Sequence, residues 1–279
     1  MIKINIICLS ICLFFSQMVL GIEGTEIAAN TVYGKVLCED MPVSGVVISD
    51  GYNLMKTNVN GDYSLSTDLK LSDFVFISIP SGYEVVSDNP ICKFYAPLSK
   101  TESSQEKNFV LRRVDNKNHV VIVASDMHIS GVVRPKASAI DTVMFRNGYL
   151  KDIAELQKSY PAETKFYGLN LGDMVWEQYW KINKVWYPEY IKMVQGINFP
   201  MFHTIGNHDY DDNYENDDRA SEQEYKKYLG PTYYSLNIGN VHYVMLDNMI
   251  YNNDNKSRKY DVTLSQNQLD WLKKDLEMM

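Results

Sequence analysis

Apolar and polar residues follow two different patterns along the chain. From residue 31 to residue 114, short runs of β-branched and aromatic residues alternate with turn residues, without a long stretch of helical spacing. The pattern predicts strands at residues 32–37, 43–49, 54–59, 63–66, 74–79 and 108–112. Asn60-Gly61, between two of them, suits a tight hairpin turn. A small all-β sandwich is therefore predicted for residues 31–114.

The pattern changes after a short polar linker at residues 115–118. Apolar strands predicted at residues 120–124, 166–171 and 199–205 alternate with amphipathic helices predicted at residues 147–160 and 187–197. The run 120–124 is entirely apolar, as expected of a strand that is covered on both faces. This alternation predicts a second, α/β domain over residues 119–279, in which the three strands are parallel.

The end of the chain carries hairpin and helix signals. A hairpin is predicted from residues 232–236 and 241–246, and Ser265 and Gln268 have the spacing of a capping box that begins a final helix. The apolar spacing within this helix predicts a buried face made of Leu269, Leu272 and Leu276.

Polar motifs follow each of the three strands predicted in the α/β domain. They are Asp126-Met127-His128, Gly172-Asp173 and Gly206-Asn207-His208-Asp209. Each motif alone has an ordinary structural explanation, but ligands of open α/β sheets bind beyond the carboxyl ends of the strands, so we expect the three to converge. Carboxylate, imidazole and amide groups together suit a metal centre that also reaches a reacting oxygen. The three motifs therefore predict a site for metal and phosphate.

The order Asp-x-His, Gly-Asp, Gly-Asn-His-Asp on this alternating framework resembles the calcineurin-like metallophosphoesterases, from about residue 120 to the end of the chain. The resemblance implies that water activated at a two-metal site hydrolyses a phosphomonoester or a phosphodiester. It places Asp126 and His128 on one divalent metal ion, Asp173 between the two ions, and Asn207 on the second ion. The expected metals are Fe, Zn or Mn.

Two further residues of the third motif would act on the substrate. The same resemblance places His208 opposite the phosphate and the leaving group, where an imidazolium can stabilise or protonate the leaving oxygen. Asp209 would orient the ring of His208, since a carboxylate neighbour fixes the tautomer of an imidazole. Trp176, Trp180 and Trp186, between the second and third motifs, are expected to form a covering layer, with a substrate-facing subset as the alternative.

The N-terminal region carries a second resemblance. Its runs Gly34-Lys35-Val36, Pro42 to Val46 and Gly61-Asp62-Tyr63 are similar to the carboxypeptidase-regulatory-like sandwich that is found attached to exported hydrolases. The region holds no cluster of titratable residues, so a structural role is expected, with glycan or partner binding as the alternative. The alternative to an enzyme is therefore a non-catalytic surface or binding protein that uses the sandwich.

Charge and composition narrow the choice of partners. The chain has 279 residues, of which 45% are apolar, so a sizeable core is expected. Its net charge is −8, which argues against nucleic acid as a partner. A small phosphorylated substrate stays compatible with an acidic protein because bound cations reverse the local field.

The first 21 residues have the pattern of a secretory signal peptide. A basic start at Lys3 precedes an apolar run, residues 6–15, that is too short for a membrane span. Residues 22–30 form a linker, and no later segment has the composition of a membrane span. We therefore expect an exported protein, periplasmic or extracellular. Its mature form keeps only Cys38 and Cys92, either as a disulfide or as two buried thiols.

The motifs of the resembled family continue beyond those found here. A further histidine and a Gly-His-x-His motif do not occur in this sequence, which leaves the second metal short of nitrogen ligands. We expect the sequence to be the front portion of an enzyme, with activity impaired in the chain as given.

Overall fold

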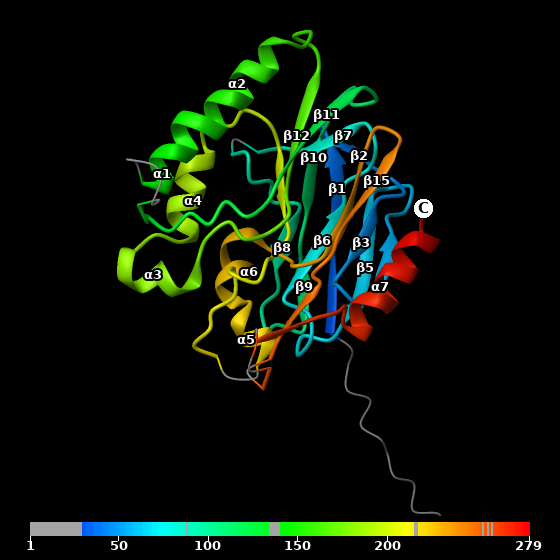
Figure 1. The fold of residues 1–279 in the computed structure, drawn as a ribbon. Helices are drawn as coiled ribbons and strands as arrows, with labels where there is room; N and C mark the ends of the chain where they lie inside the picture. The colour runs from blue at the N-terminus through cyan, green and yellow to red at the C-terminus, as the bar shows by residue number, and fades with distance from the viewer. Residues whose placement is uncertain are drawn as a thin grey trace, which may run out of the picture.

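The fold is described from a computed structural model of the chain (Figure 1). The structure describes residues 30–87, 89–133, 140–214, 217–252, 254–255, 257 and 259–279. The predicted signal peptide, residues 1–21, and all of the predicted linker except Asn30 lie outside the described residues. Two regions follow each other along the chain: an all-β region over residues 30–113 and an α/β region over residues 119–279. This order of fold classes confirms the prediction from the sequence.

The N-terminal β region forms two sheets. Its strands are β1 (Asn30–Cys38), β2 (Met41–Pro42), β3 (Val47–Ser49), β4 (Leu54–Lys56), β5 (Asp62–Thr67), β6 (Phe74–Ser78), β7 (Tyr83–Val85), β8 (Tyr95–Pro97), β9 (Ser104–Glu106) and β10 (Phe109–Arg113). One sheet has the order β2-β1-β10-β7, with β5 and β9 also paired to β1, and the other has the order β4-β3-β6-β8. Apolar residues such as Val32, Ile48 and Leu111 fill the core between them, as in a sandwich.

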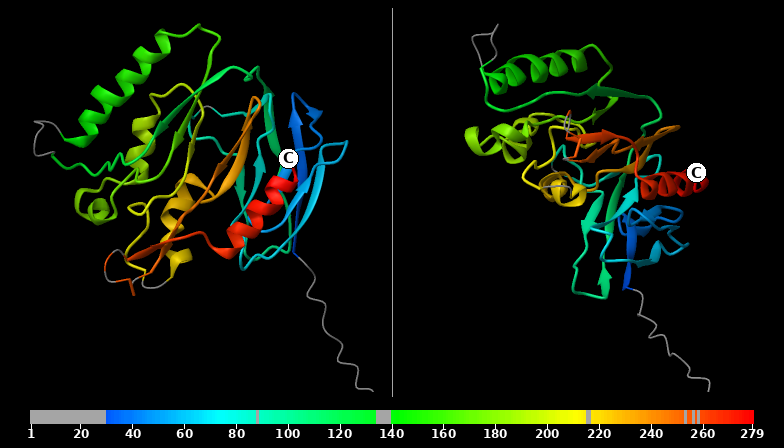
Figure 2. Two further views of the ribbon diagram at one scale, coloured as in Figure 1. Left: turned by 45° about the vertical axis from the view of Figure 1, so that its right-hand side comes forward. Right: turned by 60° about the horizontal axis from the view of Figure 1, so that its bottom comes forward.

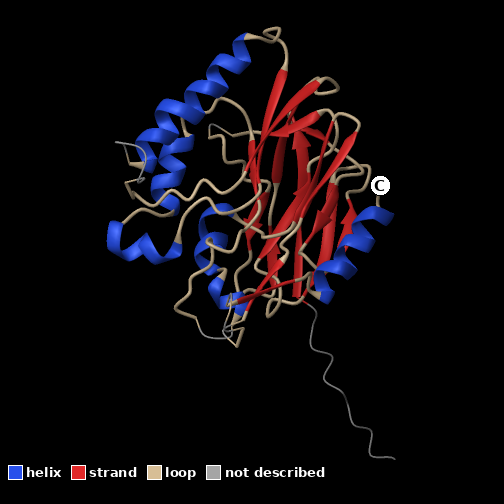
Figure 3. Cartoon of the chain, in the orientation of Figure 1, coloured by secondary structure: helices blue, strands red, loops and turns tan. Residues whose placement is uncertain are grey.

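The α/β region is built on three parallel strands, as predicted. They are β11 (His119–Ala124), β12 (Lys165–Asn170) and β13 (Met201–His203), in the order β11-β12-β13. The helical elements between them are α1 (Asp141–Met144), the π-helix η1 (Phe145–Tyr149), α2 (Leu150–Lys158), α3 (Glu177–Asn183) and α4 (Tyr187–Val194). Figures 1 and 3 show these helices gathered on one side of the strands. The carboxyl ends of the three strands consequently lie at one edge of the sheet.

The remaining elements follow β13 along the chain. They are α5 (Asp218–Ser221), α6 (Gln223–Leu229), β14 (Tyr234–Ile238), β15 (Val241–Met245), β16 (Met249–Tyr251), β17 (Tyr260–Val262) and α7 (Gln266–Glu277). Strands β14 and β15 form the predicted hairpin. The last helix, α7, lies beside this hairpin and the N-terminal strands (Figure 2). The N-cap is confirmed, because the side chain of Ser265 accepts a hydrogen bond from the backbone N–H of Gln268. The side chain of Gln268 bonds to the backbone of Asp247 and not to that of Ser265, so the second half of the predicted capping box is not formed.

The two regions share one hydrophobic core. Side chains of consecutive strand residues point to opposite faces, so Phe166 and Met201 pack with the helices while Tyr167, Leu169 and Phe202 pack with the N-terminal strands. The N-terminal β region therefore covers the face of the parallel sheet that is opposite to the helices.

Backbone hydrogen bonds also join the two regions. The N–H of Asn237 in β14 donates to the carbonyl of Ile79, at 2.8 Å, and the N–H of Met201 in β13 donates to that of Pro90, at 2.7 Å. Asn116, from the predicted linker, is buried and accepts hydrogen bonds from Gly82 and Gly239, one in each region. The two regions are thus held together by paired backbone as well as by apolar contact.

Two burial predictions were wrong. Strand β11 is an edge strand, paired among the described residues with β12 alone, and the side chain of Val123 is 57% exposed. In α7 the residues Leu269 and Leu276 are exposed, while Trp271 and Asp275 are buried. Leu272 does pack against the core. The buried face of the helix meets a partly polar surface, where Trp271 donates a hydrogen bond to Ser49 and Asp275 accepts one from Ser235.

Two expectations about membranes and cysteines were examined. Within the described part of the chain, no helix is long and apolar enough to cross a bilayer. Cys38 and Cys92 are both buried with free thiols, which agrees with the second of the two alternatives for these residues.

Candidate metal centre

The three polar motifs converge at the carboxyl ends of β11, β12 and β13. The loop after β11 runs beside the loop after β12, because the N–H of Asp126 donates to the carbonyl of Gly172, at 3.1 Å, and that of His128 to the carbonyl of Asp173, at 2.9 Å. The third loop joins them where the N–H of His208 donates to Oδ1 of Asp173, at 2.9 Å. Convergence of the motifs, expected from the order of the strands, is therefore observed.

The backbone of this site is strained. Asp126, His128 and Asp173 have positive φ angles of 54°, 45° and 54°. Residues with a side chain seldom adopt this left-handed conformation, and it persists where the surrounding structure imposes it, often at functional sites. The strain is therefore located at three of the residues predicted to bind metal.

Two glycines allow the second and third loops to touch. A Cβ atom on Gly206 would lie 2.3 Å from Oδ1 and 2.4 Å from the backbone nitrogen of Asp173. A Cβ atom on Gly172 would lie 2.7 Å from the Cα atom of Gly206. Any larger residue at either position would push the motifs apart.

Three predicted site residues form a compact group of metal-binding atoms. The candidate ligand atoms of His128, Asp173 and His208 all lie within 4.8 Å of one another. Nε2 of His128 is 3.1 Å from Oδ2 of Asp173 and 4.0 Å from Oδ1 of Asp126. The side chain of Asp126 is 67% exposed, at the rim of the group. Asn207 lies half-buried in the third loop.

Asp209 has a different place from the one predicted. Its buried carboxylate accepts hydrogen bonds from the backbone N–H groups of Asp173 at 2.7 Å, Met174 at 3.1 Å, Val175 at 3.3 Å and Gly206 at 2.9 Å. It makes no hydrogen bond with the ring of His208. The structure therefore corrects the prediction that Asp209 orients that ring: the carboxylate ties the second loop to the third instead.

Burial makes the carboxyl group of Asp209 a weaker acid than usual. Loss of solvent and the neighbouring charge of Asp173 raise the pKa of Asp209 to about 8, although hydrogen bonds from backbone N–H groups act in the opposite direction. A cation bound at the neighbouring residues would favour the ionised carboxylate. The same side chain therefore holds the second and third loops together and responds to the charge of a bound cation.

Glu177 also belongs to the site, although none of the three motifs contains it. Its Oε2 lies 2.9 Å from Nδ1 of His208, and the pair is partly buried. Burial acts against the charged imidazole, but the hydrogen bond to Glu177 and the charges of Glu177, Asp173 and Asp209 outweigh it, so the pKa of His208 is raised. The only sequence signal was an acidic residue four positions after Asp173, at the start of α3.

Trp176 packs against both histidines of the group. Its ring centroid is 5.2 Å from that of His128 and 5.0 Å from that of His208. Trp180, in contrast, is buried in the core beneath. Trp176 therefore belongs to the wall of the site, and Trp180 to the covering layer that the sequence predicted.

The loop after His128 is held by a buried carboxylate from α1. Asp141 accepts hydrogen bonds from the backbone N–H groups of Ser130, Gly131 and Val132 and from the hydroxyl group of Ser130, at 2.8 to 3.2 Å. Asn183 at the end of α3 donates to the carbonyl of Ser130, at 2.7 Å. Side chains outside the motifs therefore fix the position of the first motif.

The donor set of the group fits a divalent transition metal. The imidazole of His128 and the carboxylate of Asp173, supplemented at the rim by that of Asp126, are borderline and hard donors of the kind that bind such ions, and His208 lies within reach of them. The ring of His128 bonds to Asp173 and the ring of His208 to Glu177, which favours a structured site over a chance surface cluster.

Comparison with protein families agrees with this geometry. The family model described as the N-terminal region of calcineurin-like phosphoesterase matches residues 30–114, and the model described as calcineurin-like phosphoesterase matches residues 119–278. The chain therefore belongs to the calcineurin-like phosphoesterase family. A search of curated proteins gave no match.

Proposed function

We propose that the chain is an exported, metal-dependent hydrolase that cleaves phosphate ester bonds of a small phosphorylated molecule. The observation that carries this proposal is the close group formed by His128, Asp173 and His208 at the ends of three parallel strands. A binding role of the β region alone gives no reason for metal-binding side chains at three strand ends. The family to which the chain belongs supports phosphoester hydrolysis in general.

The residues that would hold the metal ions lie on all three loops. Asp126 and His128 would bind one divalent ion, Asp173 would bridge two, and Asn207 would bind the second. Bound ions supply Lewis-acid stabilisation of the phosphoryl oxygens and lower the pKa of the attacking water. Fe, Zn and Mn are the candidate metals.

His208 would act on the leaving group. Because Glu177 occupies Nδ1 of His208, the Nε2 atom is left to face the substrate. The raised pKa of His208 keeps a larger share of the ring protonated at neutral pH. The imidazolium can therefore stabilise charge on the leaving oxygen and donate a proton to it from Nε2. Asp209 would support this step only indirectly, by holding the two loops together.

Trp176 would limit the space beside the reacting group. Its ring touches both histidines, so it borders any substrate bound there. The net charge of −8 argues for a small substrate rather than for a nucleic acid, since the attraction for phosphate would come from bound cations alone.

Hydrolysis of chromogenic substrates tests the proposal. Purified protein loaded with Mn²⁺ or Zn²⁺ is assayed with p-nitrophenyl phosphate and bis(p-nitrophenyl) phosphate, before and after chelation. We expect metal-dependent release of nitrophenol that Asp173→Asn reduces by at least roughly 100-fold, as for the loss of a group that holds the catalytic charges. Metal-independent release, or equal release by Asp173→Asn, would overturn the proposal.

A further inference from the structure

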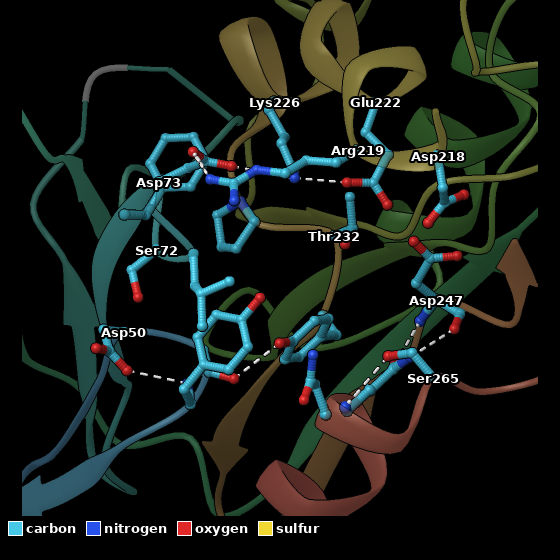
Figure 4. Close-up of a pocket in the computed structure, with 18 of the residues that line it drawn as sticks. Asp50, Ser72, Asp73, Asp218, Arg219, Glu222, Lys226, Thr232, Asp247 and Ser265 are labelled. Atoms are coloured by element: carbon cyan, nitrogen blue, oxygen red, sulfur yellow. Dashed lines mark hydrogen bonds and ion pairs between the residues drawn. The ribbon is translucent and has the colours of Figure 1, made fainter. Parts of the chain in front are cut away.

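A cavity of about 210 Å³ lies between the N-terminal β region and the α/β region. Its walls come from the turn after β3, the residues before β6, helices α5 and α6, the segment before β14 and the first residues of α7 (Figure 4). None of the motif residues of the candidate metal centre lines it. The cavity is therefore a second concave site, made jointly by the two regions.

Two polar groups in the wall of this cavity have no hydrogen-bond partner among the described residues. They are Oδ2 of Asp50 and the hydroxyl of Ser72, in residues that are only 3% and 1% exposed. Figure 4 shows both among the lining residues. Buried polar groups in folded proteins are nearly always satisfied, by water or a ligand if not by the protein. Two unsatisfied groups in the wall of one cavity therefore indicate a molecule that supplies the missing partners.

The charges of the wall show which kind of molecule fits. Its two cations are already paired: Arg219 with Asp73 at 2.6 Å, and Lys226 with both Asp73, at 3.1 Å, and Glu222, at 2.5 Å. The acidic residues Asp50, Asp218 and Asp247 form no ion pair with any described residue. The cavity thus has an excess of negative charge, and an anion would find no free cation in it.

Burial and mutual repulsion raise the pKa values of two of these carboxyl groups. Burial and the charge of Glu222 raise the pKa of Asp218 to about 6. Burial and the charges of Glu222 and Asp218 raise the pKa of Asp247 well above its ordinary value. A positive charge placed among the three would relieve this repulsion.

The lining of the cavity favours an organic cation over a metal ion as its ligand. Among the described residues, only His128, Asp173 and His208 bring three acidic or imidazole ligands within bonding range of one point, so the carboxylates of the cavity are too widely spaced to hold one ion. The rings of Tyr52 and Tyr233 also line the wall and suit a carbon skeleton. Pockets for drug-sized ligands usually enclose about 300 to 1,000 Å³, so the occupant is smaller than these.

We propose that this cavity binds a small primary amine that also carries hydroxyl groups, such as an amino sugar. The ammonium group would lie among the carboxylates of Asp218, Glu222 and Asp247. The hydroxyl groups of the ligand would satisfy Asp50 and Ser72.

Calorimetric titration of the full chain with D-glucosamine tests this inference. D-glucose serves as a neutral match of the same shape, and inorganic phosphate and Ca²⁺ serve as probes of the two rejected ligand classes. We expect one saturable site for glucosamine, with binding of glucose at least about tenfold weaker, which is the loss expected for one charge-assisted hydrogen bond. Asp218→Asn should weaken glucosamine binding about tenfold, and Ser72→Ala about threefold.

The exposed residue Asp152 on α2, far along the chain from the cavity residues, supplies the control Asp152→Asn, which should leave binding unchanged. Ser72→Ala removes only a hydroxyl group and serves as the deciding variant if Asp218→Asn does not fold. Equal binding of glucose and glucosamine, binding that neither variant weakens, a response to phosphate or Ca²⁺ alone, or no saturable binding would each overturn the inference.

Discussion

Nδ1 of His208 lies 2.9 Å from Oε2 of Glu177, and this contact crosses from the third loop of the site to the first turn of α3. It gives His208 an acidic partner from outside the three motifs. The ring is thereby held in one orientation, with Nε2 directed away from Glu177. Replacing Glu177 should change the chemistry of His208 without removing any predicted metal ligand.

Glu177→Gln should lower the pKa of His208. The charge and hydrogen bond of Glu177 raise this pKa in the native protein, so their loss reduces the protonated share of the ring at neutral pH. NMR titration of His208 measures the shift, and the alkaline limb of the pH–rate profile should move to lower pH in parallel. Glu155→Gln, at an exposed position of α2, is the control. An unchanged pKa in Glu177→Gln would contradict the role assigned to this contact.

Gly206→Ala should weaken metal binding. The added Cβ atom would lie 2.3 Å from Oδ1 of Asp173, so the second and third loops must separate. Calorimetric titration with Mn²⁺ should show a loss in affinity of about tenfold or more, as expected when ligand positions shift. The matched control is Gly148→Ala in η1, where the added atom has no neighbour within 4 Å. Equal losses in the two variants would show that loop contact is not the cause.

Trp271→Ala should destabilise the protein strongly. The ring is 1% exposed, lies beside Phe76 and Tyr233, and donates a hydrogen bond to Ser49 at 3.1 Å. Truncation of a buried tryptophan lowers the free energy of unfolding by about 3 to 5 kcal/mol.

Leu276→Ala on the same helix provides the comparison. Because Leu276 is 54% exposed, its truncation should change the free energy of unfolding by less than about 0.5 kcal/mol. Urea denaturation measures both variants. A larger loss in the free energy of unfolding for Leu276→Ala than for Trp271→Ala would show that the leucine face predicted from the sequence is the buried one.

Asp73 should make the joint between the two regions sensitive to acid. Burial acts against its charge, but the hydrogen bonds and charges of Lys100, Lys226 and Arg219 prevail and lower the pKa of Asp73 from 3.8 to about 2. A lowered pKa means that the stabilisation is present above pH 3.8 and is lost as the pH falls towards 2.

Asp73→Asn should therefore lower the free energy of unfolding by about 2 kcal/mol at neutral pH and remove part of its dependence on acidic pH. Urea denaturation between neutral and acidic pH measures both effects. Asp62→Asn, which breaks a solvent-exposed ion pair with Lys35, is the control and should change little. A pH dependence that persists unchanged in Asp73→Asn would exclude this ion cluster as its source.

The sequence predicted the elements whose pattern is local. Strands β1, β5, β6, β11 and β12, helix α4 and the hairpin β14–β15 follow from apolar periodicity and turn residues. It did not predict β7, β8, β9, β16 and β17, which have two or three apolar residues at most and are defined by their partners. The turned face of α7 was missed for the same reason, since only the tertiary structure shows that Trp271 enters the shared core.

The sequence predicted the three motifs of the site and their convergence. Convergence of the three loops follows from the parallel order of the strands alone. The roles of Asp209 and Glu177 depend on which backbone donors and which ring atom lie within hydrogen-bond range, and sequence spacing does not determine this. Glu177 therefore takes the place beside the ring of His208 that adjacency in the sequence suggested for Asp209.

Metal binding to the purified chain can be followed by calorimetry and by elemental analysis after dialysis. We expect saturable binding of Mn²⁺ or Zn²⁺ that Asp173→Asn abolishes, because Asp173 contacts both other loops through His128 and His208. Asp152→Asn, an exposed change of the same kind, should bind as the native protein does. Equal metal content in the native chain and in Asp173→Asn would contradict the assignment of this site as a metal centre.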